Sequence, residues 1–235
     1  MNNNLWLDIW QKKGKHSYDQ LHKYNGWEHF KQEEYLTFLQ RSFVPVVKKI
    51  TNSKKVLEVG CGAGSSLKYV SEINKNLELN GFDYSESLIE VCKKNLNGNF
   101  FTCDINEEKW PFIEQNAFDV VLSCGVFIYF NSYENATAAI QKSLKLLNKD
   151  GILFITDISD LSKKDLALEI RKETHSTTKK FFSKDDIQHL YYDKQFFLEI
   201  AQKNELKVHF FDHEEICDFD WNISRKYRYN VLLEK

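Results

Sequence analysis

Apolar and polar positions alternate along the middle of the chain in two different periods. Short apolar runs of strand length occur at residues 56–60, 77–82, 100–103, 118–123 and 151–156. Between them, apolar side chains recur every three to four positions, which predicts helices over residues 63–73, 86–95 and 135–147. Strands that alternate with helices form parallel sheets that are covered on both faces. The pattern therefore predicts an α/β fold with a three-layer, doubly wound sheet.

The two ends of the chain follow other patterns. Apolar side chains repeat at four-residue spacing from Leu5 to Trp10, which predicts a short amphipathic helix. A second helix is predicted over residues 28–50, with a kink at Pro45. A charged segment rich in Lys, Thr and Ser covers residues 161–183. After it, the pattern predicts a helix over 193–203 and closing strands over 208–211 and 227–233.

These elements predict one domain over residues 1–235. Its expected parts are a helical N-terminal cap (1–50), an α/β core (54–159), a variable insertion (160–192) and a C-terminal helix with closing strands (193–235).

Charge and cysteine content narrow the choice of partners. The 235 residues include 32 basic and 34 acidic side chains, a net charge of −2. Nucleic-acid binders carry a basic patch that neutralises phosphates, so no nucleic-acid partner is expected. The cysteines are odd in number and form no CxxC pair, so neither a disulfide framework nor a metal site is expected. No signal-peptide region and no run of about 18 apolar residues occurs, so we expect no membrane insertion and a cytoplasmic location.

A glycine-rich loop follows the first core strand. The sequence GCGAG occupies residues 60–64 and leads into a predicted helix. Glycines allow a sharp turn and close approach of a ligand, and the helix N-terminus favours an anionic group. The dinucleotide fingerprint GxGxxG would require glycine at position 65, where Ser65 stands. The loop therefore predicts a ligand cradle that differs from the usual dinucleotide site.

Acidic residues accompany this loop on neighbouring strands. Glu58 lies inside the first strand, Asp83 ends the second and Asp104 follows the third. Asp83 comes about 20 residues after the loop, where a carboxylate can accept both hydroxyls of a ribose. Asp104 lies one strand further out, within reach of an adenine amine. Together the acids predict a nucleoside-containing ligand.

The ordered segments LEVGCGAG, GFDYSES, FTCDIN, FDVVLSCGV and LLNKDGILFITDIS resemble the motifs of class I S-adenosylmethionine (SAM)-dependent methyltransferases. The resemblance covers residues 54–159 and implies a seven-stranded sheet whose last hairpin is antiparallel. It implies SAM as the cofactor. The loop glycines would flank the methionine part of SAM. Asp83 would bind the ribose, and Tyr84 would cover the edge of the adenine or ribose. Asp104 and Ile105 would hold the adenine, and Cys124 with Ser123 would lie beneath the sulfonium. The complete predicted set is Glu58, Gly60, Cys61, Gly62, Gly64, Asp83, Tyr84, Ser85, Cys103, Asp104, Ile105, Ser123 and Cys124.

The acceptor is less well marked. The NPPY or DPPY signature of amide-nitrogen methylation is absent, and SCGV stands in its place. The segment HSYDQLHKYNGWEHF, with His22 and Gly26, and the ending SRKYRYNVLLEK resemble methyltransferases encoded in bacterial surface-polysaccharide clusters. This resemblance implies a small-molecule acceptor, an oxygen of a sugar, nucleotide-sugar or phosphorylated capsule precursor. His22 is the first candidate base, followed by Tyr129 and His175.

Other interpretations stay open. Basic residues of the insertion would either meet an acceptor phosphate or form a solvated helix face; they are Lys163, Lys164, Arg171 and Lys172. The methyl acceptor could instead be a small amine or a protein nitrogen. The chain could also bind the cofactor without catalysis, or be a nicotinamide-dependent oxidoreductase of the same topology, although the second acid at Asp104 disfavours the latter. A monomer and a homodimer are both compatible with the sequence.

Overall fold

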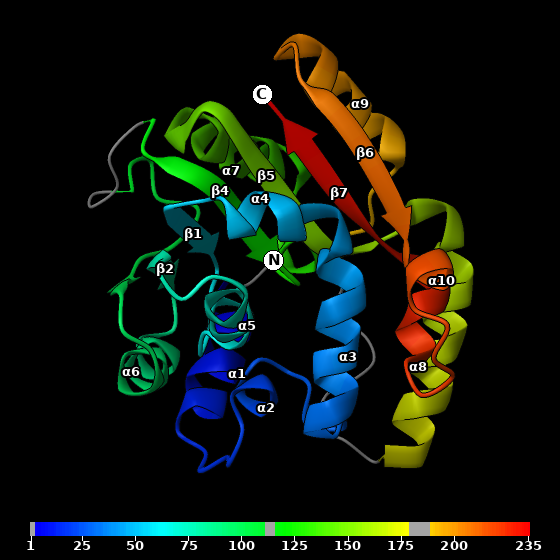
Figure 1. The fold of residues 1–235 in the computed structure, drawn as a ribbon. Helices are drawn as coiled ribbons and strands as arrows, with labels where there is room; N and C mark the ends of the chain where they lie inside the picture. Colours follow the sequence, from blue (N-terminus) through cyan, green and yellow to red (C-terminus); the bar gives the residue numbers. More distant parts are fainter. Residues whose placement is uncertain (1–2, 111–115, 179–188) are drawn as a thin grey trace.

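The computed structural model describes residues 3–110, 116–178 and 189–235. Its centre is a seven-stranded sheet in the order β3-β2-β1-β4-β5-β7-β6 (Figure 1). The strands are β1 Lys55–Val59, β2 Glu78–Asp83, β3 Asn99–Thr102, β4 Phe118–Cys124, β5 Leu147–Ser159, β6 Lys207–Asp212 and β7 Arg228–Glu234. Neighbours from β3 to β5 pair in parallel, whereas β7 pairs antiparallel with both β5 and β6. The doubly wound sheet and its antiparallel last hairpin are thus confirmed.

Helices cover both faces of the sheet, as Figure 1 shows. One face packs against α7 Tyr133–Leu146 and α9 Lys194–Lys203. The opposite face packs against α3 Gln32–Phe43, α4 Val47–Thr51, α5 Ser65–Ile73 and α6 Glu86–Asn95. Alternate strand residues enter the two cores: Leu57 faces the α7 side and Val56 the α5 side. This arrangement is the predicted three-layer architecture.

The N-terminal region is helical, as expected, but its second helix is interrupted. Helix α1 Asn3–Gly14 packs against α6, and α2 Leu21–Tyr24 follows it. The helix predicted over 28–50 begins later, at Gln32, and the predicted kink at Pro45 is a full break: the 3-10 turn η1 Val44–Val46 separates α3 from α4. Pro45 lies in that turn, where its missing amide and fixed φ break the helical hydrogen bonding. The break lets α4 turn along the sheet.

The segment after β5 forms an ordered helix before the closing elements. The 3-10 turn η3 Leu161–Lys163 leads into α8 Lys164–Thr178, which contacts η4 Ile223–Tyr227. The short helix α10 His213–Ile216 lies between β6 and η4. No helix among the residues that the structure describes has both the length and the apolar character needed to cross a membrane.

Candidate cofactor and acceptor site

The loop between β1 and α5 turns through three glycines. Gly60, Gly62 and Gly64 have φ values of 74°, 52° and 85°, in the left-handed region that side chains rarely adopt. The amides of Gly60 and Cys61 donate hydrogen bonds to the carbonyl of Phe82, at 2.9 and 3.0 Å. The loop is therefore fixed against the end of β2.

Asp83, the last residue of β2, links this loop to the start of α6. Its Oδ2 accepts the amide hydrogen of Gly62 at 3.0 Å, and its Oδ1 accepts that of Ser85 at 2.9 Å. Burial raises the pKa of the Asp83 carboxyl to about 6, although the two amide hydrogen bonds lower it. A carboxylate has about four acceptor positions, so two amides leave room for a ribose diol.

The N-terminal region meets the glycine loop through Asn25, the residue that follows α2. Its Oδ1 accepts the amide hydrogen of Ala63 at 2.8 Å, and its Nδ2 donates to the carbonyl of Cys61 at 3.4 Å. A Cβ on Gly62 would lie only 2.7 Å from Asn25 Oδ1, so a side chain at that position would displace the amide. Asn25 therefore ties the N-terminal region to the loop that the sequence marks as a ligand cradle.

Glu58 lies in the middle of β1, close to the glycine loop, and is 1% exposed. Burial raises the pKa of its carboxyl to about 8, although hydrogen bonds with Cys124 and Ser66 lower it. Among the described residues, no partner hydrogen-bonds Glu58 Oε2. A carboxyl with this pKa is mainly protonated at neutral pH, so Glu58 adds little negative charge to the site.

Three residues that the sequence assigns to the adenine end lie at the ends of β2 and β3. The Oδ1 atom of Asp104 accepts the amide hydrogen of Asn106 at 2.8 Å, which fixes the carboxylate. The carbonyl of Ile105 accepts a hydrogen bond from Lys142 at 2.6 Å. Burial raises the pKa of the Tyr84 hydroxyl, so this phenol stays neutral. All three line the same cavity as Asp83.

A cavity of about 340 Å³ opens at the carboxyl ends of the strands, within the range of ligand pockets. Eight residues of the predicted cofactor set line it: Gly60, Gly62, Asp83, Tyr84, Cys103, Asp104, Ile105 and Cys124. The remaining five lie behind this lining: Glu58, Cys61, Gly64, Ser85 and Ser123. Ser85 supports Asp83 as described above, and Ser123 Oγ donates to the carbonyl of Val59 at 3.2 Å. The structure therefore brings the predicted set together as a lining and its support.

The three candidate bases lie in different surroundings. His22 is 3% exposed, its Nε2 lies 2.9 Å from the carbonyl oxygen of Phe30, and its ring stacks on Tyr35 at 4.9 Å. The cavity lining includes Tyr35 but not His22. Tyr129 does line the cavity, and burial raises the pKa of its hydroxyl. His175 belongs to α8, but its side chain lies outside the described residues.

The cavity also contains residues that the sequence did not assign to the site. Trp6 and Trp10 of α1 line it and pack on Tyr129, with ring centroids 4.5 and 5.6 Å apart. Asp157 of β5 and Arg228 of β7 line it as well. The four-residue spacing of the tryptophans indicates a buried helix face but not its partner. The place of Asp157 near the end of a strand is a usable signal, since ligands of open α/β sheets bind there.

The strand order, the glycine loop after β1 and the acids that follow β2 and β3 define a Rossmann-like fold. Residues 50–211 match a family model described as a methyltransferase domain, which is more than half of the chain. The chain belongs to this family. Family membership confirms the methyltransferase resemblance that the ordered motifs predicted.

Curated relatives match part of the chain. A probable tRNA methyltransferase 9B of Mus musculus is 31% identical over 125 residues, covering 52% of this chain and 26% of that protein. O-methyltransferase 3 of Dictyostelium discoideum is 30% identical over 131 residues, covering 51% of this chain and 30% of that protein. The chain thus spans less than a third of the length of these two relatives.

Solved structures share the fold over nearly the whole chain. The plantazolicin methyltransferase BpumL, solved with S-adenosylhomocysteine (SAH), covers 98% of this chain and 96% of its own at a TM-score of 0.63, with 18% identity. Magnesium protoporphyrin IX methyltransferase of Synechocystis, also solved with SAH, has a TM-score of 0.61, 15% identity and coverage of 99% and 95%. SAH is SAM without its methyl group, so these structures agree with SAM as the predicted cofactor.

The residues present fit this cofactor. A side chain at Gly62 would strike Asn25, so the loop keeps a bare backbone beside the cavity. Asp83 offers a buried carboxylate for a ribose diol. Asp104 and Ile105 line the same cavity and would hold the adenine that is attached to this ribose. Glu58, behind this lining, has a raised pKa and is mainly neutral at pH 7, so it adds little negative charge near the cavity.

Proposed function

We propose that the chain transfers a methyl group from SAM to a small-molecule acceptor. The acceptor atom in this proposal is an oxygen of a sugar, a nucleotide-sugar or a phosphorylated precursor of a surface polysaccharide. One observation carries it: a single cavity joins the glycine loop and Asp83 to a second wall formed by Tyr129, Asp157 and Arg228. The first wall suits a nucleoside cofactor, and the second lies where an acceptor would enter.

The protein has limited chemistry to supply in such a reaction. SAM, when bound, carries a methyl group that is already activated on a sulfonium. Asp83 would hold the ribose, Asp104 and Ile105 the adenine, and the loop glycines the methionine part. Trp6 and Trp10 line the cavity from α1, and their apolar rings would help to exclude water from the reacting groups. The remaining task is to align the acceptor atom, which is worth a large part of the rate enhancement in displacement reactions.

The catalytic candidates take different roles in this proposal. Tyr129 lines the cavity and would orient the acceptor with its neutral hydroxyl. His22 stacks on Tyr35, whose hydroxyl lies 2.9 Å from Ser65 Oγ beside the glycine loop. A role for His22 in catalysis would therefore act through the position of this cavity wall. His175 stays a candidate from its sequence position alone.

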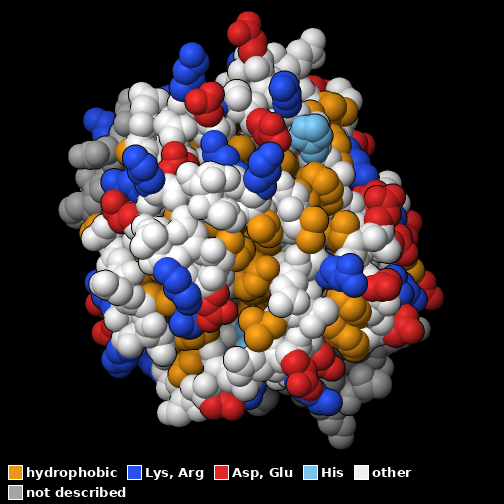
Figure 2. All heavy atoms as spheres, in the orientation of Figure 1, with side chains coloured by type: hydrophobic (Ala, Val, Ile, Leu, Met, Phe, Trp, Pro, Cys, Tyr) orange, Lys and Arg blue, Asp and Glu red, His pale blue; other side chains and the backbone are white. Residues whose placement is uncertain are grey.

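Charge distribution supports a small acceptor over a long nucleic acid. Figure 2 shows Lys and Arg side chains interspersed with Asp and Glu side chains around a central band of hydrophobic side chains. Within the described lining of the cavity, Arg228 is the one basic residue, against Asp83, Asp104 and Asp157. RNA binding relies on many Lys and Arg side chains at successive phosphates, and a lining with one basic residue does not provide them.

Two measurements test the proposal. Calorimetry should detect binding of SAM and SAH and no binding of NAD; binding of NAD alone would refute the cofactor assignment. Mass spectrometry should then detect a gain of one methyl group on a sugar or nucleotide-sugar incubated with SAM and the protein. Methylation of tRNA but of no small molecule in the same assay would refute the acceptor class.

A further inference from the structure

A buried ion pair lies in the wall of the cavity opposite the glycine loop. Asp157 is 5% exposed and Arg228 is 9% exposed, and both line the cavity. Arg228 Nη1 donates a short hydrogen bond to Asp157 Oδ2. Among the described residues, neither Oδ1 of Asp157 nor Nε of Arg228 has a hydrogen-bond partner. An unsatisfied buried carboxylate oxygen is costly, so the site is incomplete without a hydrogen-bond donor at Oδ1.

The backbone at Asp157 is strained and held in place by its surroundings. Its φ of 63° is left-handed, and the pairing of β5 with β7 shifts register between Ile155 and Ile158. The Asp157 amide donates to Asn230 Oδ1 at 3.0 Å, and His213 Nε2 lies 2.7 Å from the same oxygen. Bulges and left-handed residues that the fold enforces in this way commonly aim a side chain into a functional site.

The ion pair lies close to the end of β4. Gly125, the residue after β4, has a φ of 68°, and a Cβ there would lie 3.6 Å from Asp157 Oδ2. Burial raises the pKa of the Tyr129 hydroxyl, and this residue is near enough for Arg228 to lower and Asp157 to raise that pKa as well. The methyltransferase resemblance implies a sulfonium beside Ser123 and Cys124 at the end of β4, so under the proposed function the ion pair lies near the reacting methyl group.

We propose that Asp157 and Arg228 form the acceptor-binding site and that they select an uncharged hydroxyl group. This inference rests on the proposed function and refines it. A hydroxyl donates a hydrogen bond to Asp157 Oδ1 and, because it is neutral, does not disturb the balanced charges of the pair. A carboxylate can accept from Arg228 Nε but has no hydrogen to donate to Asp157 Oδ1. An ammonium group can donate to Asp157 Oδ1 but cannot accept from Arg228 Nε. Each charged group therefore leaves one of these two atoms unsatisfied, whereas a hydroxyl can both donate and accept. A buried ion pair with no net charge therefore favours the hydroxyl oxygen of an alcohol or a sugar over a charged acceptor group.

Matched aromatic probes test the selectivity, because tryptophan and tyrosine rings line the same cavity. Benzyl alcohol, benzylamine and benzoate differ in one polar group. Each is titrated by saturation-transfer NMR against the full chain saturated with SAH. We expect benzyl alcohol to bind at least tenfold more tightly than either charged probe. Tighter binding of benzylamine or benzoate, or no binding of benzyl alcohol, would overturn the inference.

Variants test the assignment to these residues. Asp157→Gly combined with Arg228→Met removes both charges, and glycine accepts the left-handed backbone at position 157. Asp157→Asn is the milder change, because Asn also tolerates that conformation. Either variant should weaken benzyl alcohol binding by about tenfold or more, since a hydrogen bond to a charged group is worth about 1.5–3 kcal/mol. Unchanged binding in a folded variant would refute the role of the pair.

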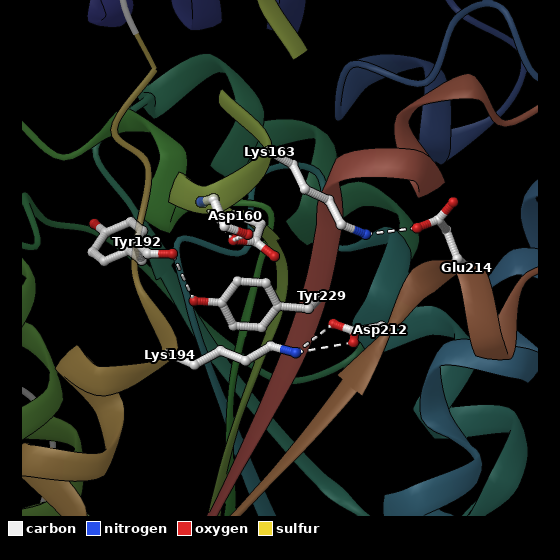
Figure 3. Close-up of polar contacts among 8 residues, drawn as sticks. Asp160, Lys163, Tyr192, Lys194, Asp212, Glu214 and Tyr229 are labelled. Atoms are coloured by element: carbon white, nitrogen blue, oxygen red, sulfur yellow. Dashed lines mark hydrogen bonds and ion pairs between the residues drawn. The ribbon is translucent and has the colours of Figure 1, made fainter. Parts of the chain in front are cut away.

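A control separates this inference from the proposed function. Asp212 of the outer strand β6 forms an ion pair with Lys194 of α9 (Figure 3). Lys194 Nζ lies 2.8 Å from Asp212 Oδ1, and neither residue lines the cavity. Asp212→Asn should leave probe binding and SAH affinity unchanged. If the unmodified chain does not bind SAH, the cofactor proposal itself is refuted. Intact SAH binding with no effect of the Asp157 variants would refute only the acceptor site.

Discussion

Replacing Glu58 with Gln tests whether a buried, protonated carboxyl supports the glycine loop. Glu58 is 1% exposed inside β1, and burial raises the pKa of its carboxyl from 4.5 to about 8. The folded protein therefore keeps the proton up to about pH 8, whereas the unfolded chain releases it near pH 4.5. Gln has the size of a protonated Glu and carries no charge at any pH. Glu58→Gln should remove this part of the pH dependence of folding.

The expected magnitude follows from the difference in pKa. A raised pKa in the folded state means that stability falls as pH rises between the unfolded and folded values and is constant above them. A rise from 4.5 to about 8 corresponds to about 5 kcal/mol at most. At pH 7 most of the folded protein still holds the proton, and the loss is roughly 3 kcal/mol. The stability gain of Glu58→Gln should therefore grow steadily with pH.

Urea unfolding of the cofactor-free protein, followed by circular dichroism, measures this difference. Free energies of unfolding at several pH values should give curves for the unmodified chain and Glu58→Gln that diverge by a few kcal/mol from about pH 5 to about pH 9. Glu90→Gln makes the same chemical change on an exposed position of α6 and serves as the control. Parallel curves for Glu58→Gln and the unmodified chain would refute an elevated pKa at Glu58.

Three further substitutions address the cofactor and the N-terminal region. Asp83→Ala removes the proposed ribose acceptor, so calorimetry should detect no SAH binding; an unchanged affinity would exclude the ribose role. Asn25→Ala removes the amide that bridges Ala63 and Cys61, and SAH affinity should fall about tenfold by calorimetry, the worth of roughly one hydrogen bond. His22→Ala should leave SAH affinity intact while slowing methylation of the true acceptor. Full methylation activity in this variant would remove His22 from the site.

Local signals were sufficient for the core of the fold. The helix predicted over 86–95 matches α6 Glu86–Asn95, because its N-cap is local: Ser85 Oγ accepts the amide hydrogen of Leu88. The glycines and Asp83 could be assigned for the same reason, since strand ends and turns are visible in the spacing of neighbouring residues. Pro45 was also a local signal: the kink predicted there is the 3-10 turn Val44–Val46, although the helix before it begins at Gln32 and not at Glu28.

The rest of the site depends on contacts between distant segments. Asn25 meets Ala63, and Arg228 meets Asp157 71 positions away. No short-range pattern marks such a pair, because each residue taken alone is compatible with a solvated surface position. The contact between Asp157 and Arg228 was therefore a part of the cavity that the sequence could not reveal.

The two walls of the cavity come from different parts of the chain, which affects how such a protein can diversify. The loops after β1, β2 and β3 supply the wall with Asp83 and Asp104, whereas α1, the segment after β4, β5 and β7 supply the wall with Tyr129, Asp157 and Arg228. Under the proposed function, substitutions in the second set would alter which acceptor is used while the donor site keeps its shape. Asn25 is the exception, since it belongs to the N-terminal region yet holds the glycine loop. Replacement of that region by a foreign segment would have to preserve this one amide.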